Sequence, residues 1–357
     1  MRVLMAMDPT GWEVPGGHKR QLQKTAEALS QLGVDVRTEP LSEEGLAWAD
    51  VLHSFGLPSE AIRAARQQQC IVAVSTIYWG ASYSTSPPWA AAARSAATTL
   101  RFAAHECVRR GRALTGRPVG PLFPDEAYST ALAFEAADVL LPNASGEAAA
   151  IARELKVTTP ARLVPNAVDP SIFDESTTPG PKDRRGVLCV GRIEPHKNQL
   201  ALIRALKQTD LELTIVGPPH PHHREYFDTC VLEGGNRVTF VPETSERDLP
   251  GLFHRHRVHA LPSLFETTGL ASLEAALGGC TLVSTDRGHA REYLGGHASY
   301  CSPWSSSSIR RAILEAHDAL PSSELQQTIR TRFTWSVAGR RTLAAYQGAA
   351  DESSARR

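Results

Sequence analysis

Two glutamates stand eight positions apart in the segment LPSLFETTGLASLEA, residues 261–275. The pattern predicts a strand, then a turn that carries Glu266, then a helix that begins at Gly269 and holds Glu274. Backbone N–H groups near Thr268–Leu270 would point at an anion there, helped by the helix macrodipole. Glu266 would lie beside that anion, and Glu274 over one turn deeper, where it can accept hydrogen bonds from sugar or ribose hydroxyls. For either glutamate alone, the simpler interpretation is an ordinary residue of a surface turn or of an exposed helix face. The pattern of the whole segment favours a binding site instead.

A second segment, VGRIEPHKN at residues 190–198, places two cations directly after another predicted strand. Gly191 lets the backbone turn sharply, and Arg192 and Lys197 follow at the carboxyl end of the strand, where doubly wound sheets bind their ligands. The planar fork of arginine and the compact charge of lysine suit a diphosphate, whose negative charge grows as it leaves. Two basic residues in a loop are by themselves more often solvated.

A third segment, VPGG at residues 14–17, follows the first predicted strand and precedes a helix. The adjacent Gly16 and Gly17 allow the backbone to approach a ligand closely, although such a pair is most often a simple turn. Neither the glycine fingerprint of dinucleotide-binding folds nor the phosphate-binding loop of nucleotide hydrolases occurs in the sequence.

Short apolar runs alternate with amphipathic helical stretches along the chain, which is the pattern of parallel sheets covered by helices. Strands are predicted at residues 3–7, 34–38, 51–54, 71–75 and 139–141, and at 186–190, 213–216, 238–241, 258–261 and 281–284. Helices are predicted at 17–32, with Gly33 as its stop, and at 199–207 and 270–277. The polar segment 175–182 has the composition of a linker. The fold class is therefore α/β with two sheets, and 357 residues suffice for two such domains.

Charge and cysteine usage exclude several classes of protein. Lys plus Arg and Asp plus Glu number 38 each, so no net field favours nucleic acid. Six cysteines are scattered without a CxxC pair and several lie in apolar runs, which indicates reduced, buried thiols in a cytoplasmic protein. No apolar run reaches the roughly 20 residues that a membrane span needs. The first apolar run is too short for a signal peptide.

Two groups of basic residues have a plain and a sharper interpretation. The arginines between Arg101 and Arg117 are interleaved with apolar residues, so they form either a solvated helix face or a basic surface for anionic lipid headgroups. His220, His222 and His223 tempt a metal interpretation, but their spacing fits no zinc template, and an exposed loop is expected. No metal site is predicted.

The three chemical segments, in this order and spacing, resemble the retaining GT-B glycosyltransferases of family 4, also called glycosyl transferases group 1. The segment ADVLLPN at 137–143 resembles the last strand of the family's first domain. VPNAVD at 164–169 resembles its PNGVD crossover, with Ala167 in place of glycine, and DRGHARE at 286–292 resembles its D-x-GG-x-x-E loop, with His289 in place of the second glycine. FTW at 333–335 resembles the start of the family's closing helix. The resemblance covers nearly the whole chain and is most specific over residues 186–292.

The resemblance implies two Rossmann-like domains whose parallel sheets face a central cleft. An acceptor-side domain is expected at 1–172, completed by a crossover helix at about 336–350, and a nucleotide-sugar-binding domain at 173–335. Carried over residue by residue, it implies that Arg192 and Lys197 stabilise the leaving diphosphate and that Glu266 binds the transferred sugar. The other donor-binding residues it implies are Glu274 for the ribose, Gly191, the backbone of Thr268, Gly269 and Leu270, and Gly16 and Gly17.

Enzymes of this family retain the anomeric configuration, through front-face attack assisted by the departing phosphate, and need no metal ion or cofactor. The partners that the resemblance implies are a nucleotide diphosphate-sugar donor and a glycan, a lipid-linked sugar or a small molecule as acceptor. Peripheral contact with the inner face of a membrane through Arg101–Arg117 is a further expectation. The base, the sugar and the acceptor are not identified by the sequence.

One departure from the family concerns Tyr78 in the run AVSTIYW, residues 73–79, where the family usually has a histidine. A similar S-x-I-Y-W run occurs in family members from bacterial surface-polysaccharide clusters. A phenol with an ordinary pKa of about 10 stays neutral near pH 7, so Tyr78 is expected to orient the donor sugar or the acceptor hydroxyl without proton transfer. The plainer alternative is that it caps the core of the first domain.

Three other functions remain as alternatives. A glycoside hydrolase could use Glu266 and Glu274 as its carboxylate pair, but it has no need of two cations aimed at a phosphate. A non-catalytic sugar- or nucleotide-binding protein could keep the same fold, although loss of the site residues would then be expected. A nicotinamide-dependent oxidoreductase shares the α/β alternation but needs the missing glycine fingerprint.

Overall fold

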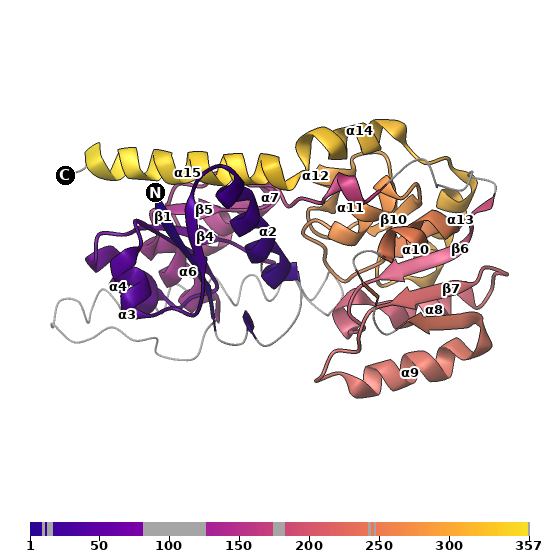
Figure 1. The fold of residues 1–357 in the computed structure, drawn as a ribbon. Coiled ribbons are helices and arrows are strands. Elements are labelled where there is room, and N and C mark those ends of the chain that lie inside the picture. Colours follow the sequence, from indigo (N-terminus) through magenta and orange to yellow (C-terminus); the bar gives the residue numbers. More distant parts are fainter. Residues whose placement is uncertain are drawn as a thin grey trace. The chain divides into compact units, whose positions relative to one another are not determined.

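The computed structural model describes residues 1–8, 11–12, 17–80, 126–173, 183–241, 244–245 and 248–355. The chain divides into two compact units, one made of Met1–Pro165 with Trp335–Arg357 and the other of Asn166–Thr334. The chain therefore leaves the first unit, builds the second and returns with its last helix, α15 (Trp335–Ala355) (Figure 1). The predicted boundary at 172/173 lies inside the second unit, and the predicted linker at 175–182 lies outside the described residues.

The first unit contains a parallel sheet of five strands in the order β2-β1-β3-β4-β5. Its strands are β1 (Arg2–Met7), β2 (Asp35–Thr38), β3 (Val51–Phe55), β4 (Ile71–Ser75) and β5 (Val139–Leu141). All five were predicted from apolar runs to within one residue at each end. The runs are continuous because strands of a parallel sheet are buried on both faces, and β3 has every residue buried.

The described α-helices of the first unit are α2 (Gly17–Gln31), α3 (Glu43–Trp48), α4 (Ser59–Gln67), α6 (Glu126–Ala136), α7 (Ser145–Ala150) and α15, and a short π-helix, η1 (Ile151–Leu155), follows α7. Helix α2 ends where the sequence predicts: Gly33 has φ +81°, and the N–H of Val34 returns to the carbonyl of Leu29 at 3.1 Å. Helix α15 packs on α2 at Gly339, where an added Cβ would come within 2.8 Å of the Cβ of Ala28. Tyr346, also on α15, is fully buried and shares a 2.6 Å hydrogen bond with Nδ1 of His53 on β3.

The second unit contains a parallel sheet of six strands in the order β11-β10-β9-β6-β7-β8. Its strands are β6 (Arg185–Val190), β7 (Leu213–Val216), β8 (Val238–Val241), β9 (His256–Leu261), β10 (Thr281–Thr285) and β11 (Ser299–Cys301). Read from β8, this is the doubly wound order 3-2-1-4-5-6, so the strand order reverses between β6 and β9. Five of these strands were predicted to within two residues at each end. The edge strand β11 was not, because its three residues form no apolar run.

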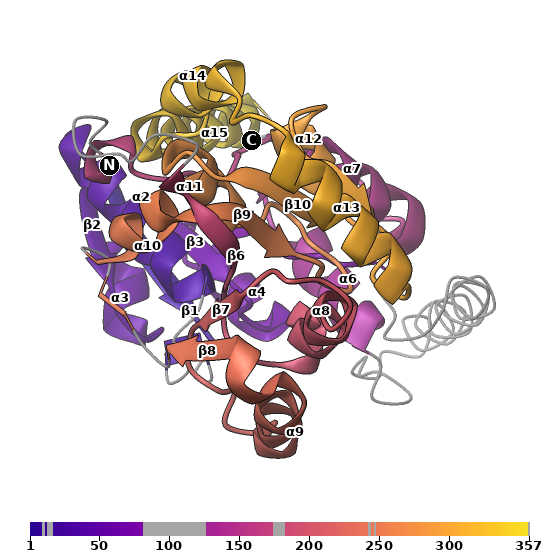
Figure 2. The ribbon, with the colours of Figure 1, turned by 90° about the vertical axis from the view of Figure 1, so that its right-hand side faces the viewer.

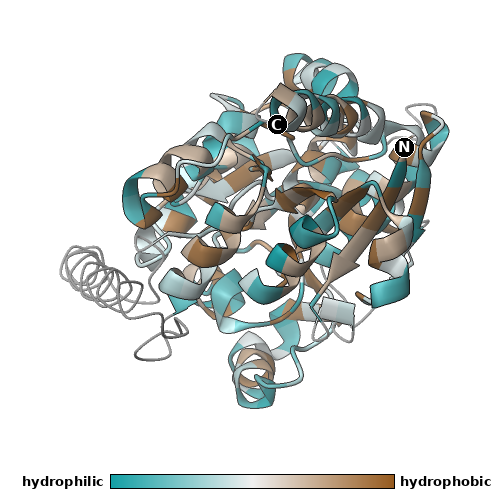
Figure 3. Cartoon of the chain, turned by 90° about the vertical axis from the view of Figure 1, so that its left-hand side faces the viewer, coloured by the Kyte–Doolittle hydropathy of each residue, from teal (hydrophilic) through white to brown (hydrophobic). Residues whose placement is uncertain are grey.

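Helices cover both faces of the second sheet (Figure 2). One face is covered by α8 (Gln199–Leu206), α9 (Arg224–Gly234) and α13 (Ser306–Asp318), and the other by α10 (Leu249–Arg255), α11 (Leu270–Leu277) and α14 (Ser323–Arg332), while α12 (Ala290–Leu294) packs on the latter core. Alternate residues of β6 enter the two cores, with Val187 and Cys189 on one side and Leu188 on the other. In the view from the side of the first unit, helices of the chain carry both polar and apolar residues, as amphipathic helices do (Figure 3). Throughout the described ranges, each helix is too short or too polar to cross a lipid bilayer.

Candidate functional site

The loops that follow β6 and β9 meet where the order of the second sheet reverses. The N–H of Leu264 donates to the carbonyl of His196 at 2.9 Å and so joins the two loops. Asn198, which has φ +61°, donates from its side-chain amide to the carbonyls of Pro262 at 3.0 Å and Pro303 at 2.9 Å. Ligands of doubly wound sheets bind at this position, and the predicted cations and glutamates therefore share one end of one sheet.

Lys197 and Glu266 form an ion pair at this junction, with 3.0 Å between Nζ and Oε2. The hydroxyl of Ser263 donates to the same carboxylate oxygen at 3.0 Å. Burial of Glu266 by itself would raise the pKa of its carboxyl, but the charge of Lys197 and these two hydrogen bonds outweigh it and hold the pKa below the ordinary value. Glu266 is therefore a buried, ionised carboxylate with one oxygen already engaged by the protein.

The backbone of Glu266 is held by the loop after β10. Its N–H donates to the carbonyl of Arg287 at 3.1 Å, and its own carbonyl accepts from the N–H of His289 at 2.8 Å. Gly288, with φ +97°, lies so close that an added Cβ would clash with the carbonyl of Glu266. The first glycine of the D-x-GG-x-x-E-like motif thus has a steric role here. His289, at the second glycine position, has φ −119° and packs its ring edgewise on Phe265 with 5.6 Å between centroids.

Arg192 is held on the other side of the junction by Glu194. Its Nε and Nη2 donate to the two carboxylate oxygens at 3.2 and 3.3 Å, and Glu194 is only 8% exposed. Gln199 fixes this turn, because its amide donates to the carbonyl of Arg192 at 2.9 Å and accepts from the N–H of Glu194 at 3.4 Å. Gly191, with φ +153°, donates its N–H to Val216 at 2.9 Å. The pairing with Glu194 was missed because two residues of separation in a loop do not reveal where the side chains point.

Helix α11 begins at the junction as predicted, with Gly269 as its N-cap at φ +74° and Leu270 as its first residue. Thr268 is buried, and its hydroxyl oxygen accepts from the side-chain amide of Asn166 at 2.9 Å. Glu274 is 2% exposed within the second turn of the helix. The backbone segment implied for the phosphates therefore leads into the helix that carries Glu274, the residue implied for the ribose.

The structure describes only some of the predicted site residues of the first unit. Gly16 lies outside the described residues, and Gly17 is the exposed first residue of α2. Tyr78 is half-buried against the core, and its hydroxyl donates to Oε2 of Glu154 at 3.1 Å. Burial, and then the charge of Glu154, raise the pKa of Tyr78 further above its ordinary value. A neutral phenol agrees with an orienting role and equally with the plainer capping role.

A buried carboxylate that the sequence analysis did not single out lies next to Tyr78. Glu147 on α7 is fully buried and accepts hydrogen bonds from the N–H of Tyr78 and of Asn143, both at 2.8 Å, and from the hydroxyl of Thr76 at 2.9 Å. Burial raises its pKa to about 7 against these hydrogen bonds. Glu147 thereby ties the segments after β4 and β5 together and fixes the backbone at Tyr78.

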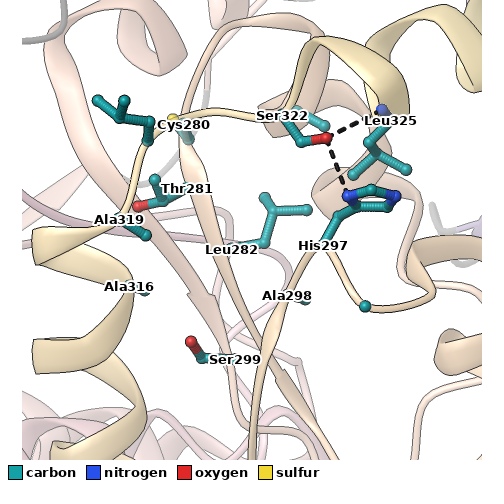
Figure 4. A pocket seen from close by; sticks show the side chains of 13 residues that line it. Cys280, Thr281, Leu282, His297, Ala298, Ser299, Ala316, Ala319, Ser322 and Leu325 are labelled. Atoms are coloured by element: carbon teal, nitrogen blue, oxygen red, sulfur yellow. Dashed lines mark hydrogen bonds between the residues drawn. The ribbon is translucent and has the colours of Figure 1, made fainter.

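A hollow of about 250 Å³ lies at the opposite, amino-terminal end of the second sheet, between Cys280, Leu282, Ser299 and Ala316 (Figure 4). On its rim, Nδ1 of His297 shares a 2.9 Å hydrogen bond with the hydroxyl of Ser322, which also caps α14. None of the predicted site residues lines this hollow, so it is separate from the junction of β6 and β9.

Residues 173–319 match the model of the family described as glycosyl transferases group 1. This segment is similar to the group 1 glycosyltransferases. It carries Arg192, Lys197, Glu266 and Glu274. A stretch of 182 residues is 30% identical to the D-inositol 3-phosphate glycosyltransferase of Mycobacterium bovis, which it matches over 46% of this chain and 37% of that protein. The chain thus matches well under half the length of this relative.

The whole chain has the GT-B fold. Sucrose-phosphate synthase from Thermosynechococcus elongatus superposes with a TM-score of 0.72 at 15% identity, over 98% of this chain and 99% of that chain. HepE from Anabaena, in complex with UDP and glucose, superposes with a TM-score of 0.68 at 16% identity, over 98% of this chain and 100% of the other. At these identities the likeness establishes the architecture, two parallel-sheet α/β domains, and the predicted fold class is confirmed.

Proposed function

We propose that this chain is a retaining glycosyltransferase that moves a sugar from a nucleotide diphosphate-sugar to an acceptor hydroxyl without a metal ion. The observation that carries the proposal is the junction of the loops after β6 and β9, where Lys197 lies 3.0 Å from Glu266 and where Arg192 follows Gly191. A cation that contacts a sugar-binding carboxylate stands where the leaving phosphate and the transferred sugar are joined in such a donor.

The roles proposed for the residues follow from their chemistry. Arg192 and Lys197 stabilise the diphosphate as negative charge accumulates on it, together with the backbone N–H groups of Thr268, Gly269 and Leu270 at the start of α11. Glu266 accepts hydrogen bonds from hydroxyls of the transferred sugar. Because an ammonium group has three N–H donors, Lys197 can bind Glu266 and a phosphate oxygen together. Glu274 binds the ribose hydroxyls.

In the proposed reaction, the bond between the anomeric carbon and the phosphate oxygen breaks. The acceptor oxygen bonds to that carbon on the same face, and its proton passes to the departing phosphate. Tyr78 stays neutral throughout, because its raised pKa keeps the phenol protonated. The proposal therefore assigns no proton transfer to Tyr78, and Gly16, Gly17 and Gly191 provide room for the donor.

The hydrolase alternative is less well supported. A glycosidase needs one carboxyl group with a raised pKa to protonate the leaving group. Lys197 and Ser263 instead hold the pKa of Glu266 below its ordinary value. Glu266 is thus suited to accept hydrogen bonds as an anion and unsuited to serve as a general acid at neutral pH.

For the acceptor, we propose only its class, which is a glycan, a lipid-linked sugar or a small molecule, as in surface-polysaccharide assembly. We place the reaction in the cytoplasm, in keeping with the free, buried thiols of the five described cysteines. Peripheral membrane contact through Arg101–Arg117 stays a prediction, because these residues lie outside the described ranges.

A thermal-shift screen with UDP, GDP, ADP and dTDP in excess chelator tests the proposal. A nucleotide at a hundredfold excess over its Kd stabilises the fold by about 2.7 kcal/mol. The best nucleotide is then supplied as its sugars, and the anomeric configuration of the product is read by NMR. Arg192→Ala and Lys197→Ala should each slow the transfer, because each should raise its activation free energy by roughly 2–4 kcal/mol. The absence of a thermal shift with any of the nucleotides would contradict the proposed donor. Activity that returns only with added Mn²⁺ or Mg²⁺ would contradict the metal-free mechanism, and a product of inverted configuration would contradict retention.

A further inference from the structure

In the phosphate-binding corner of the proposed site, the two cations assigned to the diphosphate are each paired with a carboxylate. Arg192 is paired with Glu194 and Lys197 with Glu266, so two cations face two carboxylates. A site for a nucleoside diphosphate, which carries at least two negative charges, would be expected to keep an excess of positive charge. Glu266 has a task in the proposed reaction, because it binds the sugar. Glu194 has none there, so the effect of its charge needs an explanation.

Glu194 is built into the corner and is not a chance surface contact. Its side chain is 11% exposed, whereas that of Arg192 is 30% exposed. The carboxylate thus lies beneath a guanidinium that solvent, or a ligand, can reach. Gln199, which is fully buried, accepts from the N–H of Glu194 and donates to the carbonyl of Arg192, so both ends of the pair are anchored through one side chain.

His220 lies beside Glu194 and adds no positive charge to these pairs. Nε2 of His220 lies 3.9 Å from Oε2 of Glu194, and its Nδ1 accepts from the N–H of His222 at 3.1 Å. A ring nitrogen that accepts a hydrogen bond carries no proton, so this contact favours the neutral ring. Burial, and then the charge of Arg192, lower the pKa of His220 as well. His220 therefore supplies a neutral N–H beside Glu194 and no third positive charge.

We infer that Glu194 sets the affinity of the site for nucleoside diphosphates: it holds the Arg192 fork in place, and its negative charge weakens phosphate binding. The inference rests on the proposed function. Glu194 accepts from Nε and Nη2 of Arg192, so a phosphate oxygen that binds the same guanidinium would approach it away from this carboxylate. A carboxylate behind that fork repels the phosphate, and the repulsion keeps the nucleoside diphosphate product from binding too tightly to leave.

The two effects of Glu194 have opposite signs, so substitutions can separate them. Glu194→Gln keeps an oxygen that accepts from the fork and removes the charge, so the Kd for UDP, or for whichever of GDP, ADP and dTDP binds best, should fall about tenfold. Glu194→Ala removes the charge and the hydrogen bonds, so the gain should be smaller, about threefold. Glu194→Asp keeps the charge and should bind within about threefold of the wild type.

The matched control is Glu233→Gln. Glu233 on α9 is also a carboxylate that pairs with an arginine fork, that of Arg204, and with Lys207, but it belongs to none of the loops at the junction. Removing its charge should leave the Kd for the nucleoside diphosphate within about twofold of the wild type, since exposed charges are screened by salt over about 10 Å.

Titration calorimetry of the full chain in chelator provides the decisive numbers, and a melting curve without nucleotide confirms that each variant is folded. Tighter binding by Glu194→Gln, with Glu233→Gln unchanged, supports the inference. If Glu194→Gln is unfolded, Glu194→Ala decides by the same criterion. Binding by the wild type that neither neutral variant tightens would overturn the inference and leave the proposed function standing. A wild type that binds none of the four nucleotides would overturn both.

Discussion

The ion pair between Lys197 and Glu266 makes the sharpest prediction about the stability of the second unit. Lys197→Met keeps most of the apolar stem of the side chain and removes the charge, so Glu266 is left as a buried carboxylate with the hydroxyl of Ser263 as a remaining donor. Removing one partner of a fully buried pair costs about 3–5 kcal/mol. The side chain of Glu266 is 9% exposed but that of Lys197 is 21% exposed, so water screens part of the pair. We therefore expect a loss of about 2–3 kcal/mol at pH 7.5.

Glu266→Gln, which removes the other partner, should reduce the unfolding free energy by less, because Lys197 can turn toward water when its partner is removed. We expect about 1 kcal/mol for Glu266→Gln, and a double variant that is more stable than the sum of the two losses by about 1–2 kcal/mol. Calorimetric melting of the full chain is the suitable assay, since the two units can unfold in separate transitions. Losses that simply add would show that the pair contributes no coupling, and the assignment of Lys197 as the group that holds Glu266 ionised would be wrong.

The same pair predicts how the loss depends on pH. In the wild type the pKa of Glu266 lies below its ordinary value, so the stability it contributes is present above the unfolded pKa and is lost as pH falls through the folded pKa. In Lys197→Met, burial remains while the opposing charge is gone, so the pKa should rise above the unfolded value. The variant is then relieved of its buried charge as pH falls. The difference in unfolding free energy should therefore narrow between pH 7.5 and pH 5, and a constant difference would contradict the reasoning.

Three further predictions concern other residues. Glu266→Gln should mainly lower kcat, because it acts on the transferred sugar, whereas Glu274→Gln should mainly raise the KM for the donor; steady-state kinetics that show the reverse would mean that the two roles are exchanged. Tyr78→Phe removes the 3.1 Å hydrogen bond to Glu154, so it should cost the first unit about 0.5–1.5 kcal/mol and slow transfer tenfold at most, with an unchanged pH–rate profile; a thousandfold loss with a displaced limb would show proton transfer by the phenol. Burial lowers the pKa of His53 and of His259 to about 3, so each must stay neutral in the folded state while it protonates near pH 6.5 in the unfolded state. Each should reduce the unfolding free energy of its own unit by about 1.4 kcal/mol per pH unit as pH falls below 6. His53→Gln should abolish this pH-dependent loss in the first unit. Chemical denaturation at a series of pH values can measure both effects.

Much of the frame that positions the site can be predicted from the sequence, because it depends on local patterns. The apolar runs of β6 and β9 and the glycine before α11 predict a strand, a loop and a helix with little ambiguity. Those elements in turn place Arg192, Lys197, Glu266 and Glu274 at one end of one sheet. The edge strand β11 is too short for any pattern to identify.

The partners of these side chains could not be predicted, since they depend on how the loops fold back. Arg192 and Lys197 were expected as cations aimed at a phosphate, and each is already paired with a carboxylate. The pairing of Lys197 with Glu266 joins residues 69 positions apart, through loops connected by Asn198 in a left-handed conformation. Ser263 and Gly288 entered the site in the same way, through contacts that no spacing in the sequence reveals.

The return of α15 to the first unit affects the order in which the protein can fold during synthesis. Fully buried Tyr346 and the close contact of Gly339 with Ala28 belong to the core of the first unit, yet the ribosome adds them only after all of Asn166–Thr334. The second unit is continuous in sequence and can be completed while the first still lacks a helix. During synthesis, the surface of α2 that later contacts α15 therefore stays exposed until α15 has been made. A chain that ends before Trp335 should contain a folded second unit and an incomplete first unit that proteases and chaperones can reach.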